Sequence, residues 1–97
     1  MMLMVVHFEI DPEKMKKALE KTDQMRELIK KNPEEYPKFV TPGYIYNGET
    51  KGFQVIEIEK PEQLMKIASF YMPEKKYTCK QVIPASVAQE IWKIQFS

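Results

Sequence analysis

The apolar residues of this chain follow two different spacings, which predict strands alternating with helices. Residues 3–8 form a continuous apolar run rich in Val, which predicts a largely buried strand. Asp11 and Pro12 follow, a pair typical of a helix start. Apolar residues then recur at helical spacing over residues 15–29, and the Asn-Pro pair at 32–33 predicts the end of this helix.

The rest of the chain predicts a hairpin, a second helix and a further strand. Residues 33–42 carry three prolines and little periodicity, which favours a loop over the first helix, with a lid or a dimer contact as alternatives. YIYNGETKGFQVIEIE, residues 44–59, predicts two strands around a turn. The remaining predicted elements are a helix from Pro61 to a stop at Pro73, a strand over 77–83, and a short terminal helix whose Ser86-x-x-Gln89 has the form of a capping box.

This order, β-α-β-β-α-β plus a short C-terminal helix, predicts an α+β fold of the ferredoxin-like split βαβ type with an antiparallel sheet. Right-handed crossovers place both long helices on one face of that sheet. The first strand presents Leu3, Val5 and His7 on one side and an equally apolar set on the other. A solvated sheet face should alternate apolar and polar residues. We therefore expect a homodimer that forms through the helix-free sheet face, with the helices outside.

Composition narrows the classes of partner. The 97 residues predict a single domain over 1–97, and 15 basic against 14 acidic residues give a net charge of +1, which provides no bulk attraction for nucleic acid or an anionic membrane. No apolar run approaches the roughly 20 residues that span a bilayer. The apolar start has no basic region typical of a signal peptide, so the expected location is cytoplasmic. One histidine and one cysteine cannot form a closed zinc site, and we expect no metal and no cofactor.

One nucleic-acid motif has a partial match. KGFQVIEI, residues 51–58, resembles the third-strand signature of RNA-recognition motifs at Lys51, Gly52 and Phe53. The two later aromatic positions of that signature are Val55 and Ile58 here, and the neutral net charge also opposes RNA binding. We therefore expect no nucleic-acid partner.

A broader resemblance covers nearly the whole chain. MLMVVHFEIDPE, GYIYNGETKGFQVIEIEKPEQL and YTCKQVIPASVAQ, in this order and spacing, are similar to the dimeric α/β-barrel superfamily, in particular to a family of small stand-alone domains of unknown function within it. The resemblance implies a homodimer whose two sheets enclose a barrel. Relatives in the superfamily include cofactor-free monooxygenases, haem-degrading enzymes, isomerases and stress-response proteins. A haem-degrading activity would need His7 as its axial ligand, and we do not favour it.

His7 and Glu57 are the candidate catalytic residues. Treating the first and third strands as adjacent and parallel, we expect both side chains to meet near the strand ends on the helix-free face, where His7 exchanges protons and Glu57 orients it. The alternative is a hydrogen-bonded polar pair at the rim of a dimer interface, which we favour. The candidate ligand-binding residues around them are Tyr44, Tyr46, Tyr77 and Gln81.

Two further residues invite a structural interpretation. We interpret Cys79 as a small buried hydrophobe rather than a nucleophile. Trp92 is expected to anchor the terminal helix to the sheet edge or to the partner subunit.

The function hypotheses follow from these residues. We favour a small homodimer that binds a small apolar or aromatic molecule or serves as an assembly module. The alternative is a cofactor-free enzyme, with monooxygenase or isomerase-like proton transfer at His7 and Glu57.

Overall fold

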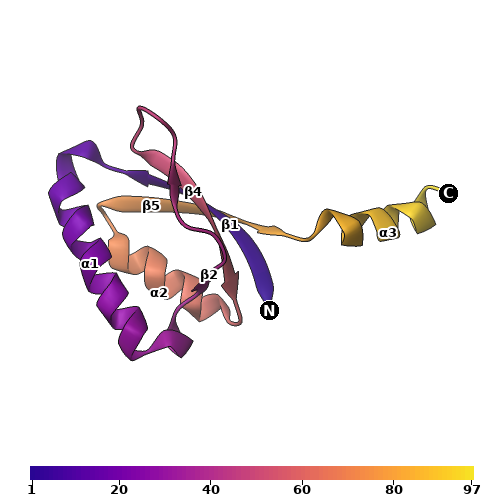
Figure 1. The fold of residues 1–97 in the computed structure, drawn as a ribbon, viewed down its shortest axis with the longest axis horizontal. Helices are drawn as coiled ribbons and strands as arrows, with labels where there is room; N and C mark the ends of the chain where they lie inside the picture. Colours follow the sequence, from indigo (N-terminus) through magenta and orange to yellow (C-terminus); the bar gives the residue numbers. More distant parts are fainter.

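The computed structural model describes residues 1–97 and shows an α+β fold with an open, five-stranded antiparallel sheet (Figure 1). The strands are β1 (Met2–Ile10), β2 (Lys38–Phe39), β3 (Tyr44–Ile45), β4 (Lys51–Ile58) and β5 (Lys75–Val82). The helices are α1 (Met15–Lys31), α2 (Pro61–Tyr71) and α3 (Ala85–Gln95), with 3₁₀ turns at Pro12–Lys14 and Pro33–Glu35. None of these helices is long and apolar enough to cross a membrane.

The start and end of the first helical segment agree with the sequence signals. The Asp11 carboxylate accepts a hydrogen bond of 3.0 Å from the Glu13 backbone N–H, and Pro12 opens the 3₁₀ turn that leads into α1. The helix ends at Lys31, directly before Asn32 and Pro33. On its inner face Ala18 and Met25 are buried, whereas Leu19 is 57% exposed. The apolar stripe thus extends beyond the face that packs inward, and Leu19 lies outside that face.

The strand order in the sheet is β2-β4-β1-β5, and β3 also pairs with β4. The predicted hairpin is confirmed, with Tyr44 opposite Phe53 and Gly48 in the turn at φ 85°. The loop expected over residues 33–42 is only partly irregular, because it contains a 3₁₀ turn and the short strand β2. The strand before β4 is thereby split into two short pieces.

The expected parallel pairing of the first and third strands is wrong, because β1 and β4 run antiparallel. A strand-helix-strand crossover keeps the chain direction, and the hairpin that follows reverses it. The register places His7 opposite Phe53 and Leu3 opposite Glu57. His7 and Glu57 therefore lie toward opposite ends of the β1–β4 ladder.

The core lies between the sheet and the two long helices, in two clusters. Met25, Tyr36, Ile67 and Tyr71 form one cluster, and Val6, Ile56 and Ile58 form the other. Leu64 and Tyr77 pack against both clusters and connect them. Since only 13 of 97 residues are buried, this core is small for the length of the chain.

An ion pair ties α1 to the turn between α2 and β5. The Lys21 ammonium lies 2.7 Å from a Glu74 carboxylate oxygen and donates to the Met72 carbonyl at 3.0 Å. The hydrogen bond from Lys21 lowers the pKa of Glu74 below its usual value. This contact holds the start of β5 against α1.

Helix α3 projects away from the rest of the chain on an extended segment that follows β5 (Figure 1). It has no buried residue, and Trp92 is 56% exposed. Within one chain, therefore, Trp92 does not anchor the helix to the sheet edge. The predicted capping box is also wrong, because no side chain caps α3 and the helix begins after Pro84.

Candidate functional site

The sheet face away from α1 and α2 carries the candidate site. Along β1, the buried residues Val6 and Phe8 face the helices, so Leu3, Val5 and His7 face the other way. The register extends this open face to β4 and β5, since residues directly opposite each other share a face. The full set on β4 and β5 is Lys51, Phe53, Val55, Glu57, Lys76, Thr78, Lys80 and Val82.

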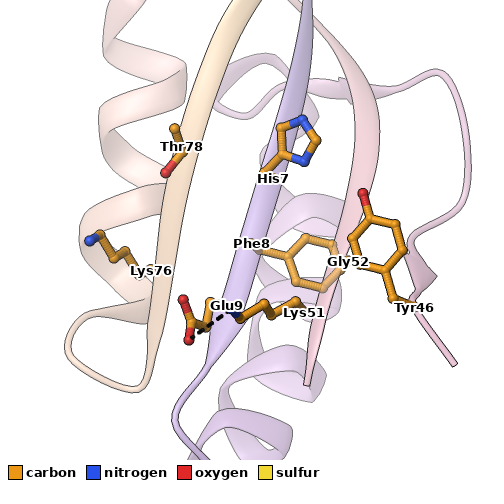
Figure 2. Close-up of a pocket in the computed structure, with 8 residues that line it drawn as sticks. All are labelled: His7, Phe8, Glu9, Tyr46, Lys51, Gly52, Lys76 and Thr78. Atoms are coloured by element: carbon orange, nitrogen blue, oxygen red, sulfur yellow. Dashed lines mark ion pairs between the residues drawn. The ribbon is translucent and has the colours of Figure 1, made fainter. Parts of the chain in front are cut away.

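His7 stands in a shallow depression of about 170 Å³ at one end of this face (Figure 2). Its neighbours across the sheet are Thr78 on β5 and Phe53 on β4. Figure 2 shows His7 between the strand that carries Thr78 and the segment that carries Tyr46. The imidazole is exposed, so water reaches it freely in a single chain.

Tyr46 lines this depression and belongs to a group of three neighbouring aromatic rings. The Tyr44 ring stacks on Phe53 with centroids 5.4 Å apart, and the Tyr46 ring lies 5.9 Å from the same Phe53. Stacked and tilted rings at these separations attract one another beyond their burial of apolar area. Tyr46 thus lies beside His7, whereas Tyr44 lies opposite Phe53 and does not line the depression.

Charged residues form the outer rim. Glu9 and Lys51 make an ion pair of 3.9 Å, drawn as a dashed line in Figure 2, and both side chains are more than half exposed. Lys76 lies opposite Glu9 in the β1–β5 ladder. Exposed pairs of this kind contribute little to stability. Their effect is to surround the depression with charges of both signs.

The predicted meeting of His7 with Glu57 is wrong. Glu57 lies opposite Leu3, four residues along β1 from His7, a separation of about 13 Å at the usual rise of a strand. Its other neighbour across the sheet is Lys38 of β2. Glu57 therefore cannot orient or charge the imidazole, and the rim hydrogen bond between the two is equally absent.

Tyr77 and Gln81 do not line this site either, because alternation along β5 puts them on the helix face. Tyr77 lies opposite Phe8, with ring centroids 6.5 Å apart, and burial raises the pKa of its phenol. Gln81 lies opposite Met4 and is exposed. Side chains on one strand share a face only when they are an even number of positions apart, and Tyr77 and Gln81 are an odd number of positions from Thr78.

Cys79 shares the helix face with Tyr77 and packs beside the cluster around Val6. Burial raises the pKa of its thiol, which keeps the sulfur protonated and a poor nucleophile. This agrees with a packing role. The chain contains no group of three or more His, Cys, Asp or Glu side chains that could hold a metal ion.

Four polar residues of the depression were not foreseen. They line it beside His7 and are Glu9, Lys51, Lys76 and Thr78. Their participation depends on the β1–β4–β5 register, which hydrophobic patterning does not fix to single residues. In the sequence, the Lys51-Gly52 pair at the start of β4 is recognisable only as part of a partial match to an RNA-binding signature.

Comparison with protein-family models, with curated proteins and with solved structures finds no match to this chain. The function must therefore be inferred from the geometry of the chain itself. The depression around His7 combines one imidazole, the hydroxyl of Thr78 and the aromatic ring of Tyr46. Such a set can hydrogen-bond a polar group of a small molecule while stacking on its apolar part.

Proposed function

We propose that this protein is a homodimeric assembly module in which the open sheet faces of two copies stack against each other. The strand order β2-β4-β1-β5 supports a ferredoxin-like arrangement, with β2 and β3 together as its second strand. Two such sheets stacked face to face, with α1 and α2 outside, form a dimeric α/β barrel. The observation that carries the proposal is the aliphatic centre of the open face, which nothing in the chain covers.

That centre consists of residues paired directly across the ladder. Val5 lies opposite Val55 on β4, and Leu3 lies opposite Val82 on β5. The exposed Lys80 lies opposite Val5 on β5 and Glu57 lies opposite Leu3 on β4, so charged residues border this centre. The four aliphatic side chains are half-buried in the single chain, between neighbours on the sheet and solvent. An uncovered aliphatic surface of this kind is characteristic of an interaction site. A second copy offers the same surface, and a two-fold axis makes it self-complementary.

The surface area of the chain also supports association. A folded monomer of 11.5 kDa exposes about 5,800 Å² by the usual scaling with mass, whereas this chain exposes 7089 Å². The excess of about 1,300 Å² is larger than the roughly 800 Å² that one subunit buries in a standard interface. Exposed apolar residues of α3, such as Ile94, contribute to it.

Dimerisation would also change the environment of His7. Stacked sheets would turn the exposed depression into an enclosed space, with His7 and Thr78 as polar groups and Tyr44 and Tyr46 beside them. A small aromatic molecule is the ligand that such a lining favours. We do not retain the enzymatic alternative with paired acid and base, because the register separates His7 from Glu57.

Sedimentation equilibrium at micromolar concentration tests the proposal through the variants Val5→Lys and Val55→Lys. Each places an ammonium at the centre of the proposed interface, where burial of an unpaired charge is strongly unfavourable. We expect the wild type to sediment as a dimer and both variants as folded monomers. Leu19→Lys is the matched control, because it makes the same kind of change at an exposed apolar residue on the outside of α1.

The control variant should sediment as a dimer with the wild-type dissociation constant. A monomeric wild type would overturn the proposal. So would dimers of Val5→Lys and Val55→Lys as stable as the wild type, since the contact would then involve another surface.

A further inference from the structure

A second cavity lies on the opposite side of the sheet, between α1 and the helix face of the strands. Its volume is about 470 Å³, within the range of sites for small molecules. Nine of its 14 lining residues are hydrophobic, including Phe8, Met25, Ile29, Ile45 and Ile67. The proposed dimer interface does not cover it, because that interface uses the other face.

One cation is held inside this apolar lining. The Lys75 ammonium lies 4.4 Å from the ring centroid of Phe8, 4.5 Å from that of Tyr71 and 5.4 Å from that of Tyr77. Ring faces at these distances attract a cation. Eight ion pairs form in the chain, and none of them includes Lys75. No carboxylate therefore lies within 4.0 Å of its ammonium. Lys75 is therefore a cation without a counter-ion.

The charged groups near Lys75 are engaged elsewhere or do not neutralise it. Its chain neighbour Glu74 is paired with Lys21. Asp23 on α1 is paired with Arg26, a second cation of the cavity lining. Tyr71 and Tyr77 face Lys75, and burial raises the pKa of both phenols, so neither supplies a negative charge near neutral pH. Burial also lowers the pKa of Lys75 to about 8, which leaves the amine mostly protonated at pH 7.

We infer that this cavity binds an apolar monocarboxylate, with the carboxylate against the Lys75 ammonium and the hydrocarbon part among Met25, Ile29 and Ile45. The carboxylate supplies the counter-ion that the chain lacks, and a charge-assisted hydrogen bond in an apolar site is strong. Tyr71 and Thr22 provide hydroxyl groups at the same wall, where the Tyr71 hydroxyl donates to Thr22 Oγ1 at 3.4 Å. One cation without a counter-ion and a largely apolar lining favour a monoanion over a phosphate, whose dianion is far more costly to desolvate.

Octanoate and its neutral analogue octan-1-ol are suitable probes, titrated into the ¹⁵N-labelled protein at pH 7 and followed by NMR. We expect saturable octanoate binding that shifts backbone signals of residues in the cavity wall, such as Thr22, Ile45 and Tyr77. Octan-1-ol should bind at least about tenfold more weakly, because it lacks the charge-assisted contact. The variant Lys75→Met should weaken octanoate binding by a similar factor and leave octan-1-ol binding nearly unchanged.

Lys16→Met is the matched control, since Lys16 is an exposed lysine of α1 that forms none of the ion pairs. It should bind octanoate as the wild type does. Absence of saturable octanoate binding overturns the inference. Equal octanoate affinities of the wild type and Lys75→Met overturn it as well, as does equal binding of the acid and the alcohol.

A measurement on the wild-type protein keeps the test independent of any substitution. The ¹³Cε signal of Lys75 reports its protonation, and a bound carboxylate favours the charged form of the amine. We expect saturating octanoate to raise the pKa of Lys75 from about 8 toward its ordinary value. An unchanged Lys75 titration in octanoate would show that the carboxylate does not contact the amine, and would also overturn the inference.

Discussion

Single residues position the hairpin against the core, and Gly52 is the clearest case. A β-carbon at Gly52 would overlap the Tyr44 carbonyl and approach the Phe8 ring to 2.8 Å. The absence of a side chain therefore allows β3 to lie directly on β4 while Phe8 remains buried below. Tyr46 reaches the His7 depression as a result.

Gly52→Ala should destabilise the protein by about 1–3 kcal/mol, the usual cost of forcing an extra group into a packed site. Urea unfolding at a fixed protein concentration measures the change. Gly43→Ala is the matched control, because its added β-carbon would meet only the Phe8 ring at an ordinary 3.9 Å. A Gly52→Ala variant as stable as Gly43→Ala would show that β3 does not lie this close to β4.

Lys75 predicts a pH dependence of stability. Its pKa falls from 10.5 to about 8 on folding, so the unfolded state binds the proton more tightly. The folded state is therefore destabilised below pH 8, and this effect disappears as the pH rises toward 10.5. The three aromatic rings around the ammonium offset part of the cost.

Lys75→Met removes the charge and retains the apolar stem. We expect this variant to be more stable than the wild type by about 1–3 kcal/mol at pH 7, with a gap that narrows steadily between pH 8 and 10.5. Urea unfolding across this pH range measures it. A gap that is absent at pH 7, or that widens with pH, would show that Lys75 is solvated in the folded state.

Among the three helices, α3 is the one that buries no residue in the single chain. Val87, Ile91 and Trp92 are all about half exposed along it, and Ile94 is 82% exposed. A helix with so much uncovered apolar surface gains stability by packing on another surface. The extended segment after β5 carries it away from its own sheet (Figure 1). We therefore expect α3 to pack on the second copy in the proposed dimer.

Trp92 is the only tryptophan and reports on this directly. In the wild-type dimer we expect blue-shifted, quencher-protected fluorescence, because the ring packs against the partner. In the monomeric Val5→Lys variant it should emit like a solvated tryptophan and be quenched readily by acrylamide. Identical spectra and quenching for the two proteins would mean that α3 takes no part in the dimer.

Elements and their order could be predicted from patterning, because the signals that mark them are local. Asp11-Pro12, Pro61 and Pro73 mark helix ends, and the apolar spacing identifies the inner faces. The site depended on register and direction, which are set across strands. A crossover keeps the chain direction and a hairpin reverses it, so the order of elements already implies that β1 and β4 are antiparallel. The antiparallel pairing separates His7 from Glu57.

The alternation of side chains along β5 determines whether Lys75 or Lys76 faces the helices. Lys75 and Lys76 are consecutive in a strand, so one of them must point to the helix face. Which one does so follows from Tyr77, whose ring belongs to the core. The aromatic surroundings of Lys75 could not be predicted, because Phe8 and Tyr71 come from distant parts of the chain.

At the scale of the whole molecule, one chain is more extended than its length requires. Its radius of gyration is 15.7 Å, whereas a compact chain of this length has about 12.5 Å. The open sheet face and the projecting α3 both expose apolar residues that a second copy could cover. In a two-fold dimer each copy covers the open sheet face and α3 of the other, because the symmetry repeats every contact.

The most direct test of this account is to ask which atoms meet across the interface. Isotope-filtered NOE spectra of a dimer mixed from labelled and unlabelled chains detect only contacts between subunits. We predict intermolecular NOEs to the methyl groups of Leu3, Val5 and Val55 on the open face. Intermolecular NOEs confined to outer helix residues such as Leu19 and Met65, with none to the open face, would contradict the stacked-sheet dimer.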